Sequence, residues 1–423
     1  SLIIARTHIG IGAPNKQDTA GAHGAPLGTD ELALTKQAYG RDPQQSFVVP
    51  TDVEDHMRGC LVRGAELEMA WQKQLDAKKS TPAVADWLAV ADGELPAGWG
   101  SELPVFIPED GAKATRQISG AVIQALAKKI PLLLGGSADL APSNNTEIKG
   151  ADSWIPGKSG RNIHYGIREH AMGSILNGLT HTPGIIPFAG TFFVFADYMR
   201  PPIRLAAMMG LAPIYVMTHD SIGLGEDGPT HQPVEHLASL RAMPNLTVIR
   251  PADANETVEA WKAAIANRQG PTMLVLTRQG LPTVDRNTFA PASGLQQGGY
   301  VLAAEEGDLQ MLLIATGSEV QHAMAARETL QSEGIGTRVV SLPSWELFEA
   351  QDQCYRDEVL PPSCRKRVAI EAGSTFGWER YIGNDGTIVG MTSYGASAPI
   401  DELMKQFGFT AENLLVEARK LLV

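Results

Sequence analysis

The chain has 423 residues, of which 43% are hydrophobic and 19% are charged, and its formal net charge is −12. This length and composition predict a globular protein of about two to four domains of roughly 100–200 residues each. The negative charge argues against a nucleic-acid or anionic-membrane surface, but it permits a local basic pocket for a small anion. The 3 cysteines show no metal-ligand spacing and are typical of a cytoplasmic chain. No apolar run reaches the ~20 residues of a membrane span, so we expect no membrane partner.

The first part of the chain, residues 1–95, combines a strand-like start with a glycine-rich segment and polar helices. Residues 1–7 (SLIIART) have the composition of a buried strand. A buried strand at this position usually needs neighbouring strands that come earlier in the chain. We therefore expect that the chain is a truncated or processed form whose amino-terminal part is missing.

The middle of the chain, residues 96–290, alternates between strand and helix patterns. Strands are predicted at 131–136, 214–218, 246–250 and 273–277, and helices at 115–129, 168–179, 195–209, 235–242 and 255–266. This alternation predicts an α/β fold in which helices flank a parallel sheet on both faces.

Residues 291–423 repeat the theme as a smaller α/β domain, after a Pro/Gly/Ser-rich boundary at 290–299. Strands are predicted at 311–315, 338–342 and 367–371. Ser318 and Gln321 have the spacing of a capping box, so we expect a helix to begin at Ser318 and to end near Gly334.

Several polar side chains fall where the predicted strands end or the helices begin. His219 and Arg278 each end a strand, Arg116 starts a helix, and Ser143 follows a strand in a loop. The carboxyl ends of the strands in such a sheet converge on one crevice. Two guanidinium groups, an imidazole and a hydroxyl in that crevice could bind a phosphate.

Three further segments are candidates for a site. Residues 225–233 (GEDGPTHQP) place Asp227 and His231 on a Gly/Pro-rich turn after a strand. His23 lies in a glycine-rich stretch, where a ligand can approach the backbone closely. Phe192, Phe195 and Tyr198 recur at a spacing of three residues, which predicts one helical face that is either core or a slot for a flat heteroaromatic ring.

These residues lie within a set of motifs that resembles bacterial transketolases. The motifs are residues 23–28 (HGAPLG), 135–144 (GGSADLAPSN), 165–170 (YGIREH), 218–233 (THDSIGLGEDGPTHQP), 250–253 (RPAD), 278–279 (RQ) and 315–320 (ATGSEV). They occur in the family's order over essentially the whole chain. The resemblance implies an incomplete diphosphate-binding domain at 1–95, a pyrimidine-binding domain at 96–290 and a carboxyl-terminal domain at 291–423. It also implies a cytoplasmic homodimer that uses thiamine diphosphate with Mg2+ or Ca2+ in the pentose phosphate pathway.

The resemblance implies a role for each matching residue. Glu169 matches the glutamate that hydrogen-bonds the aminopyrimidine ring and activates the cofactor. Phe192, Phe195 and Tyr198 match the pocket for that ring, and Asp139 matches a carboxylate near the thiazolium. The family's binding site for the phosphate end of the sugar is matched by Arg116, Ser143, His219 and Arg278. Asp227 matches a residue that binds a substrate hydroxyl, and His23 and His231 match histidines that assist proton transfer, His23 also lying near the diphosphate.

One departure affects the expected activity. The family binds its metal and the diphosphate through a Gly-Asp-Gly motif with a later asparagine, and no Gly-Asp-Gly occurs in this chain. We therefore expect transfer of a two-carbon ketol unit from a ketose phosphate to an aldose phosphate by the intact protein, and no activity from this chain alone. The alternatives are a dihydroxyacetone synthase, which uses formaldehyde as acceptor, and a non-catalytic transketolase-like subunit.

Overall fold

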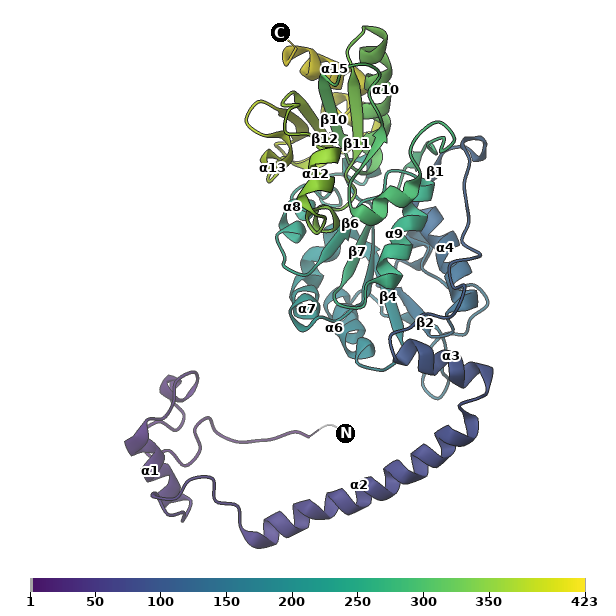
Figure 1. Ribbon diagram of the computed structural model, residues 1–423. Coiled ribbons are helices and arrows are strands. Elements are labelled where there is room, and N and C mark those ends of the chain that lie inside the picture. The colour runs from purple at the N-terminus through teal and green to yellow at the C-terminus, as the bar shows by residue number, and fades with distance from the viewer. Residues whose placement is uncertain (1–2, 423) are drawn as a thin grey trace. The chain divides into compact units, whose positions relative to one another are not determined.

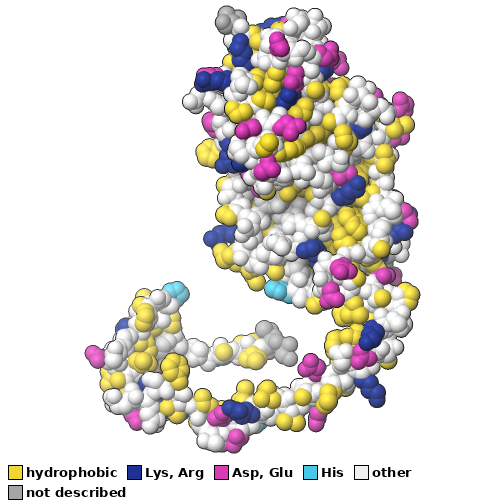
Figure 2. Space-filling view, viewed as in Figure 1, with side chains coloured by type: hydrophobic (Ala, Val, Ile, Leu, Met, Phe, Trp, Pro, Cys, Tyr) yellow, Lys and Arg dark blue, Asp and Glu magenta, His cyan; other side chains and the backbone are white. Residues whose placement is uncertain are grey.

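The computed structural model describes residues 3–422 and divides into two compact units, residues 1–80 and 81–423 (Figure 1). The amino-terminal unit contains α1 (Thr29–Ala38) and the long α2 (Thr51–Lys78). No residue of α2 is buried, and Figure 2 shows apolar side chains along the surface of this helix. Leu67 and Trp71 are among its exposed apolar residues. Within residues 3–422, no helix combines the length and the apolar character that a membrane span requires.

The strand expected at residues 1–7 is wrong for its described part. Residues 3–7 form neither helix nor strand, and Ile3 and Ile4 are 89% and 78% exposed; residues 1 and 2 lie outside the described residues. An apolar run becomes a strand only where a neighbouring strand pairs with its backbone, and residues 3–7 pair with none that the structure describes.

A six-stranded parallel sheet forms the centre of the second unit (Figure 1). Its strand order is β3-β2-β4-β5-β7-β6. The strands are β2 (Leu133–Ser137), β3 (Asn162–His164), β4 (Ile186–Phe192), β5 (Ile214–Thr218), β6 (Thr247–Ile249) and β7 (Thr272–Leu276). The helices of this part are α3 (Pro82–Ala91), α4 (Thr115–Lys129), α5 (Ala141–Asn144), α6 (Glu169–Thr180), α7 (Ala196–Met209), α8 (His236–Arg241) and α9 (Ala254–Ala266).

Both faces of this sheet are buried, as the continuous apolar character of β5 predicts. Ile214 and Val216 point to a core shared with α4 and α9, whereas Tyr215 and Met217 point to a core shared with α6, α7 and α8. The alternation follows from the two-residue period of a strand. The predicted α/β fold is confirmed for this region.

The carboxyl-terminal region forms a second sheet with the order β13-β12-β10-β11-β9, in which only β9 is antiparallel among the described strands. The strands are β9 (Tyr300–Ala303), β10 (Met311–Ala315), β11 (Thr337–Ser341), β12 (Arg367–Ser374) and β13 (Thr387–Met391). The helices are α10 (Val320–Ser332), α11 (Trp345–Glu349), α12 (Gln353–Val359), α13 (Glu379–Ile382), α14 (Ile400–Gln406) and α15 (Ala411–Lys420). Two short strands, β1 (Lys113–Ala114) just before α4 and β8 (Gly280–Leu281) after β7, form a separate antiparallel pair.

The helix expected to begin at Ser318 instead begins at Val320, after a 3-10 turn at Gly317–Glu319. The Ser318 hydroxyl is not free to cap the helix, because it donates a hydrogen bond to Glu319 and accepts one from Arg250. A tertiary contact therefore overrides the local capping signal.

Arg250, at the end of β6, is fully buried between the two sheets. It donates to Asp220 Oδ2 through Nε at 2.9 Å and Nη2 at 2.8 Å, and to the Thr316 carbonyl at 3.0 Å. It also forms an ion pair with Glu319. Burial by itself would lower the pKa of the Arg250 guanidinium, but the carboxylates of Glu319 and Asp220 raise it, so the side chain stays charged. The guanidinium of Arg250 thus links Asp220, which lies beside the end of β5 in the first sheet, to the second sheet.

We expect the substitution Arg250→Met to destabilise the protein by about 3–5 kcal/mol, because it leaves two buried carboxylates without their cation. Urea denaturation followed by tryptophan fluorescence measures this change. Arg365→Met is the matched control, because Arg365 pairs with Asp385 at 2.6 Å but is 71% exposed; we expect its effect to stay below about 1 kcal/mol. Equal losses in the two variants would contradict the role of Arg250.

Candidate functional site

The four residues predicted to bind a phosphate lie together at the carboxyl edge of the six-stranded sheet. Arg116, in the first turn of α4, donates from Nη1 to the Ser143 carbonyl oxygen at 2.6 Å. Arg278 follows β7 and is close enough to Arg116 to lower the pKa of that guanidinium, after the larger effect of burial. His219 follows β5 and is 3% exposed. The site therefore presents two guanidinium groups and an imidazole within one crevice.

A buried relay of hydrogen bonds fixes the orientation of His219. The Thr218 hydroxyl donates to Asn144 Oδ1 at 2.7 Å and lies 2.8 Å from His219 Nδ1. Asn144 in turn donates to Ser137 Oγ at 2.9 Å. Because a hydroxyl has one proton and Thr218 gives it to Asn144, His219 must donate its Nδ1 proton to Thr218. The Nε2 atom of neutral His219 is then left with a free lone pair.

The electrostatics of the crevice keep His219 neutral. Burial lowers the pKa of the His219 imidazole to about 3, with further contributions from the positive charges of Arg116, Arg278 and His231. His219 also has a φ angle of +62°, and so does Asp139, which follows β2. Left-handed conformations of this kind are rare for residues with a side chain and tend to occur at functional sites.

The aromatic residues of the site are arranged differently from the prediction. Phe192 ends β4, Phe195 ends a 3-10 turn and Tyr198 lies in the first turn of α7, so they do not share one helical face. The rings of Phe192 and Phe195 stack with centroids 5.8 Å apart and planes 8° apart. Phe192 also stacks on His219 at 3.7 Å, and Phe195 meets His231 edge-on at 5.7 Å. Tyr198 contacts Phe195 at 6.1 Å but is 64% exposed.

Glu169 begins α6 and is 8% exposed. No hydrogen bond to its carboxylate occurs among the described residues. Since β3, β4 and β5 are parallel, the helices that precede and follow β4 both begin at the carboxyl edge of the sheet. Glu169 and Phe195, at the starts of α6 and α7, therefore lie at the same edge as the cationic crevice. Asp139 at this edge is exposed.

Two predicted residues are not brought into this constellation by the described contacts. Asp227 is exposed on the turn before His231, and His23 belongs to the amino-terminal unit. The residues that the sequence did not assign are Thr218 and Asn144. The sequence held a clue to both, since each is a small polar residue next to a predicted site residue, His219 or Ser143. Only the fold shows that Thr218 and Asn144 contact one another.

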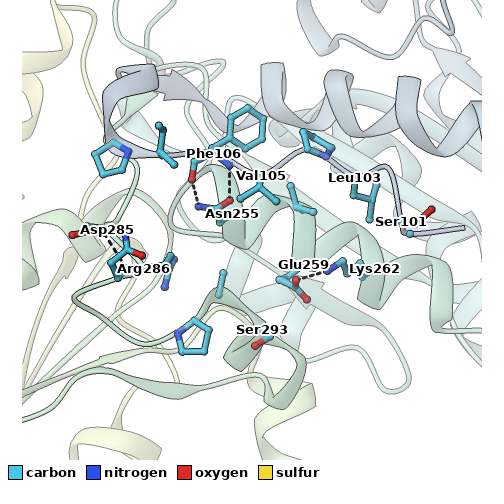
Figure 3. A pocket seen from close by; sticks show the side chains of 18 residues that line it. Ser101, Leu103, Val105, Phe106, Asn255, Glu259, Lys262, Asp285, Arg286 and Ser293 are labelled. Atoms are coloured by element: carbon cyan, nitrogen blue, oxygen red, sulfur yellow. Dashed lines mark hydrogen bonds and ion pairs between the residues drawn. The ribbon is translucent and has the colours of Figure 1, made fainter. Parts of the chain in front are cut away.

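A separate pocket of about 470 Å3 lies against α9 (Figure 3). It is lined by residues 103–108, by α9 side chains and by the segment near Arg286, and it contains none of the predicted site residues. Its polar groups are largely occupied by one another: Asn255 bonds both backbone polar groups of Phe106, and Lys262 pairs with Glu259 (Figure 3). The chemistry therefore points to the sheet edge rather than to this pocket.

Sequence comparisons place each part of the chain within known domain families. Residues 1–96 match the transketolase thiamine diphosphate binding domain, residues 111–283 the transketolase pyrimidine binding domain, and residues 298–410 the transketolase-like carboxyl-terminal domain. A curated transketolase of Geobacillus stearothermophilus is 52% identical over the full length of this chain. The chain spans 64% of the length of that relative.

Solved structures show the same fold. A transketolase of Pichia stipitis in complex with sedoheptulose-7-phosphate superposes with a TM-score of 0.91 at 39% identity, over 98% of this chain and 61% of that one. A structure described as a split-gene transketolase in an inactive beta4 tetramer gives a TM-score of 0.59 at 28% identity, over 74% of this chain and 99% of that one.

The neutral state of His219 predicts how stability depends on pH. The pKa of His219 is lowered in the folded state, so the unfolded chain binds the extra proton below an ordinary pKa of about 6.5 and stability falls as the pH falls toward about 3. The variant His219→Gln cannot take up this proton. On lowering the pH from 7 to 5, we expect the original protein to lose about 2 kcal/mol of stability that the variant does not lose. The stability of the variant relative to the original protein therefore rises by that amount.

Urea denaturation at the two pH values measures this difference. His181→Gln, at an exposed histidine that follows α6, is the matched control, and the difference between the two pH values should be smaller for it than for His219→Gln, because an exposed side chain keeps its contact with water on folding. A flat difference for His219→Gln would show that His219 is not held neutral.

Proposed function

Because this chain belongs to the transketolase family, we propose that the whole protein transfers a two-carbon ketol unit reversibly from a ketose phosphate to an aldose phosphate, in the pentose phosphate pathway. The observation that carries the proposal is the convergence of Arg116, Ser143, His219 and Arg278 at one sheet edge, beside buried Glu169 and the Phe192–Phe195 stack. A relative's complex with sedoheptulose-7-phosphate supports sugar phosphates as the substrates.

The residues at this edge fit the pyrimidine end of thiamine diphosphate. A flat heteroaromatic ring needs an aromatic face to stack on and a hydrogen-bonding group at its edge, and Phe195 and the unpartnered, buried Glu169 could supply them. We propose that Phe192 and Tyr198 complete this pocket and that Asp139 lies near the thiazolium. When bound, the cofactor supplies an electron sink for the transferred unit. Glu169 would hold a proton at the ring edge, where burial keeps water away.

The cationic crevice would anchor the phosphate of the sugar. Arg116 and Arg278 provide charge-assisted hydrogen bonds, and the Ser143 hydroxyl provides a further donor. Neutral His219 can accept a hydrogen bond from a ligand hydroxyl at Nε2, because its Nδ1 proton is donated to Thr218. We propose that Asp227 binds a substrate hydroxyl and that His231 and His23 assist proton transfer at the substrate oxygens.

The proposed assembly is a homodimer. The outer surface of α6 and α7, with the loop before α6, exposes a run of large apolar side chains: Ile167, Ile175, Leu205, Met208 and Met209 are 46–79% exposed. Apolar groups gathered on a surface in this way are typical of protein–protein contacts. We propose that a second copy covers this surface, so that Glu169 works with the diphosphate-binding part of the opposite subunit.

The diphosphate and its Mg2+ or Ca2+ would be held outside the residues assigned here, because the chain has no Gly-Asp-Gly sequence. We therefore propose that the chain alone is inactive. The inactive beta4 tetramer of a split-gene transketolase is consistent with this proposal. The proposed location is the cytoplasm, since all three cysteines are free thiols.

We expect Glu169→Ala in the intact enzyme to lower kcat by about 10²–10⁴-fold while cofactor binding is largely retained, because the lost group acts in proton transfer. Steady-state assays with ribose phosphate as acceptor, together with calorimetry of cofactor binding, measure both effects. Glu402→Gln, at an exposed position of α14, is the control. Unchanged turnover would remove the assigned role, and a preference for formaldehyde over ribose phosphate would favour dihydroxyacetone synthase.

Loss of one guanidinium group should affect phosphate recognition selectively. We expect Arg278→Met to raise KM for a ketose phosphate by about ten- to a hundredfold, the value of one or two hydrogen bonds to a charged group. The same variant should leave turnover of an unphosphorylated ketose nearly unchanged. An equal loss with both substrates would show that Arg278 acts on the fold rather than on the phosphate.

A further inference from the structure

One group of potential metal ligands lies outside the candidate active site. Asp197 in the first turn of α7, Glu235 just before α8 and His236 at the start of α8 each present a ligand atom, and these atoms all lie within 4.8 Å of one another. No other group of three or more His, Cys, Asp or Glu residues within 3–422 meets this distance. Asp197 and Glu235 are exposed, whereas His236 is 4% exposed.

The imidazole of His236 supplies a second, independent observation. Both of its ring nitrogens are buried, and neither has a hydrogen-bond partner among the residues that the structure describes. Buried polar atoms are nearly always paired, so an orphaned histidine inside a fold needs an explanation. Nε2 lies beside the other two ligands, 3.3 Å from Asp197 Oδ2, without forming a hydrogen bond to it. The ring is held by Phe193, whose centroid is 5.6 Å away.

The spacing suits a tetrahedral cation. Zinc binds imidazole nitrogen and carboxylate oxygen at about 2.0–2.2 Å, so two ligands on one tetrahedral ion lie about 3.3–3.6 Å apart. The measured separation of 3.3 Å between His236 Nε2 and Asp197 Oδ2 falls in this range. Glu235 can supply a third ligand, and its exposure leaves a fourth position for water. The two carboxylates offset the charge of a divalent ion.

A nearby cation does not occupy the group. Arg200 lies one turn further along α7, but its guanidinium donates to the Ser239 hydroxyl at 3.1 Å and to the Ser239 carbonyl at 3.0 Å. These bonds direct Arg200 toward the second turn of α8 rather than toward the carboxylates. The two hydrogen bonds of Arg200 also join α7 to α8 without the help of an ion. The starts of the two helices, which carry the three ligands, are therefore held near one another by the protein itself.

We propose that Asp197, Glu235 and His236 form a zinc site that cross-links the start of α7 to the start of α8. This site is separate from the metal that accompanies the cofactor in the proposed function, because it uses neither the phosphate crevice nor Glu169. Its role is structural: an ion bound to the folded state alone stabilises that state by mass action.

The test uses the full 423-residue chain, stripped of metal by a chelator and then dialysed. Calorimetric titration with zinc sulfate should show about one equivalent bound in the micromolar range, and Co2+ should give the intense visible absorption of a tetrahedral site. Each of the variants His236→Gln, Asp197→Asn and Glu235→Gln should weaken zinc binding by about tenfold or more. Zinc should raise the Tm of the original chain but not that of Asp197→Asn.

His8→Gln is the matched control. His8 pairs with Asp18 at 3.0 Å, but both are exposed and belong to no three-ligand group, so this variant should keep full zinc affinity. Because Asp197 and Glu235 are exposed, their variants should fold even if His236→Gln does not. The proposal would be overturned if the original chain bound no zinc. It would also be overturned if all three ligand variants bound zinc as tightly as the original chain.

Discussion

The buried guanidinium of Arg250 is the constraint on which the arrangement of the second unit depends. It joins Asp220, which follows the end of β5, to Thr316 and Glu319 at the end of β10. The fit is tight, because a side chain at Gly317 would meet the guanidinium carbon at 2.6 Å. Since Asp220 adjoins His219, the same contact that docks the second sheet also fixes the strand end that carries the candidate site.

A buried group of charges joins two sheets stably only if each charge has a partner of opposite sign. Burying charges is costly unless every one is paired, and here Arg250 meets two carboxylates while Glu319 also accepts from the Ala372 backbone at 2.9 Å. The arrangement therefore tolerates little displacement. This suits a site in which the orientation of a single imidazole, that of His219, decides whether a hydrogen bond is accepted or donated.

The candidate site combines this rigid support with the guanidinium charges of Arg116 and Arg278, with which no carboxylate within residues 3–422 forms an ion pair. Arg116 and Arg278 repel one another and disfavour a charge on His219. An anionic ligand would offset that repulsion, so the two guanidinium groups favour the binding of a phosphate. The neutral tautomer imposed by Thr218 and Asn144 adds a directional acceptor at the same place.

The sequence by itself determined the alternation of strands and helices, and with it the parallel sheet and the edge at which His219 and Arg278 lie, because these depend on periodicity and on the rule that the carboxyl ends of parallel strands meet at one edge. Glu169 follows β3, a strand that the sequence did not predict, so only the structure places it at this edge. The tertiary structure alone decided the strand order, the pairing of Arg250, the relay through Thr218 and the meeting of Asp197 with His236. Those contacts join residues far apart in the chain, where no local spacing records which partners will meet. The failed strand at residues 3–7 has the same cause, because a strand is completed by its neighbours and not by its own composition.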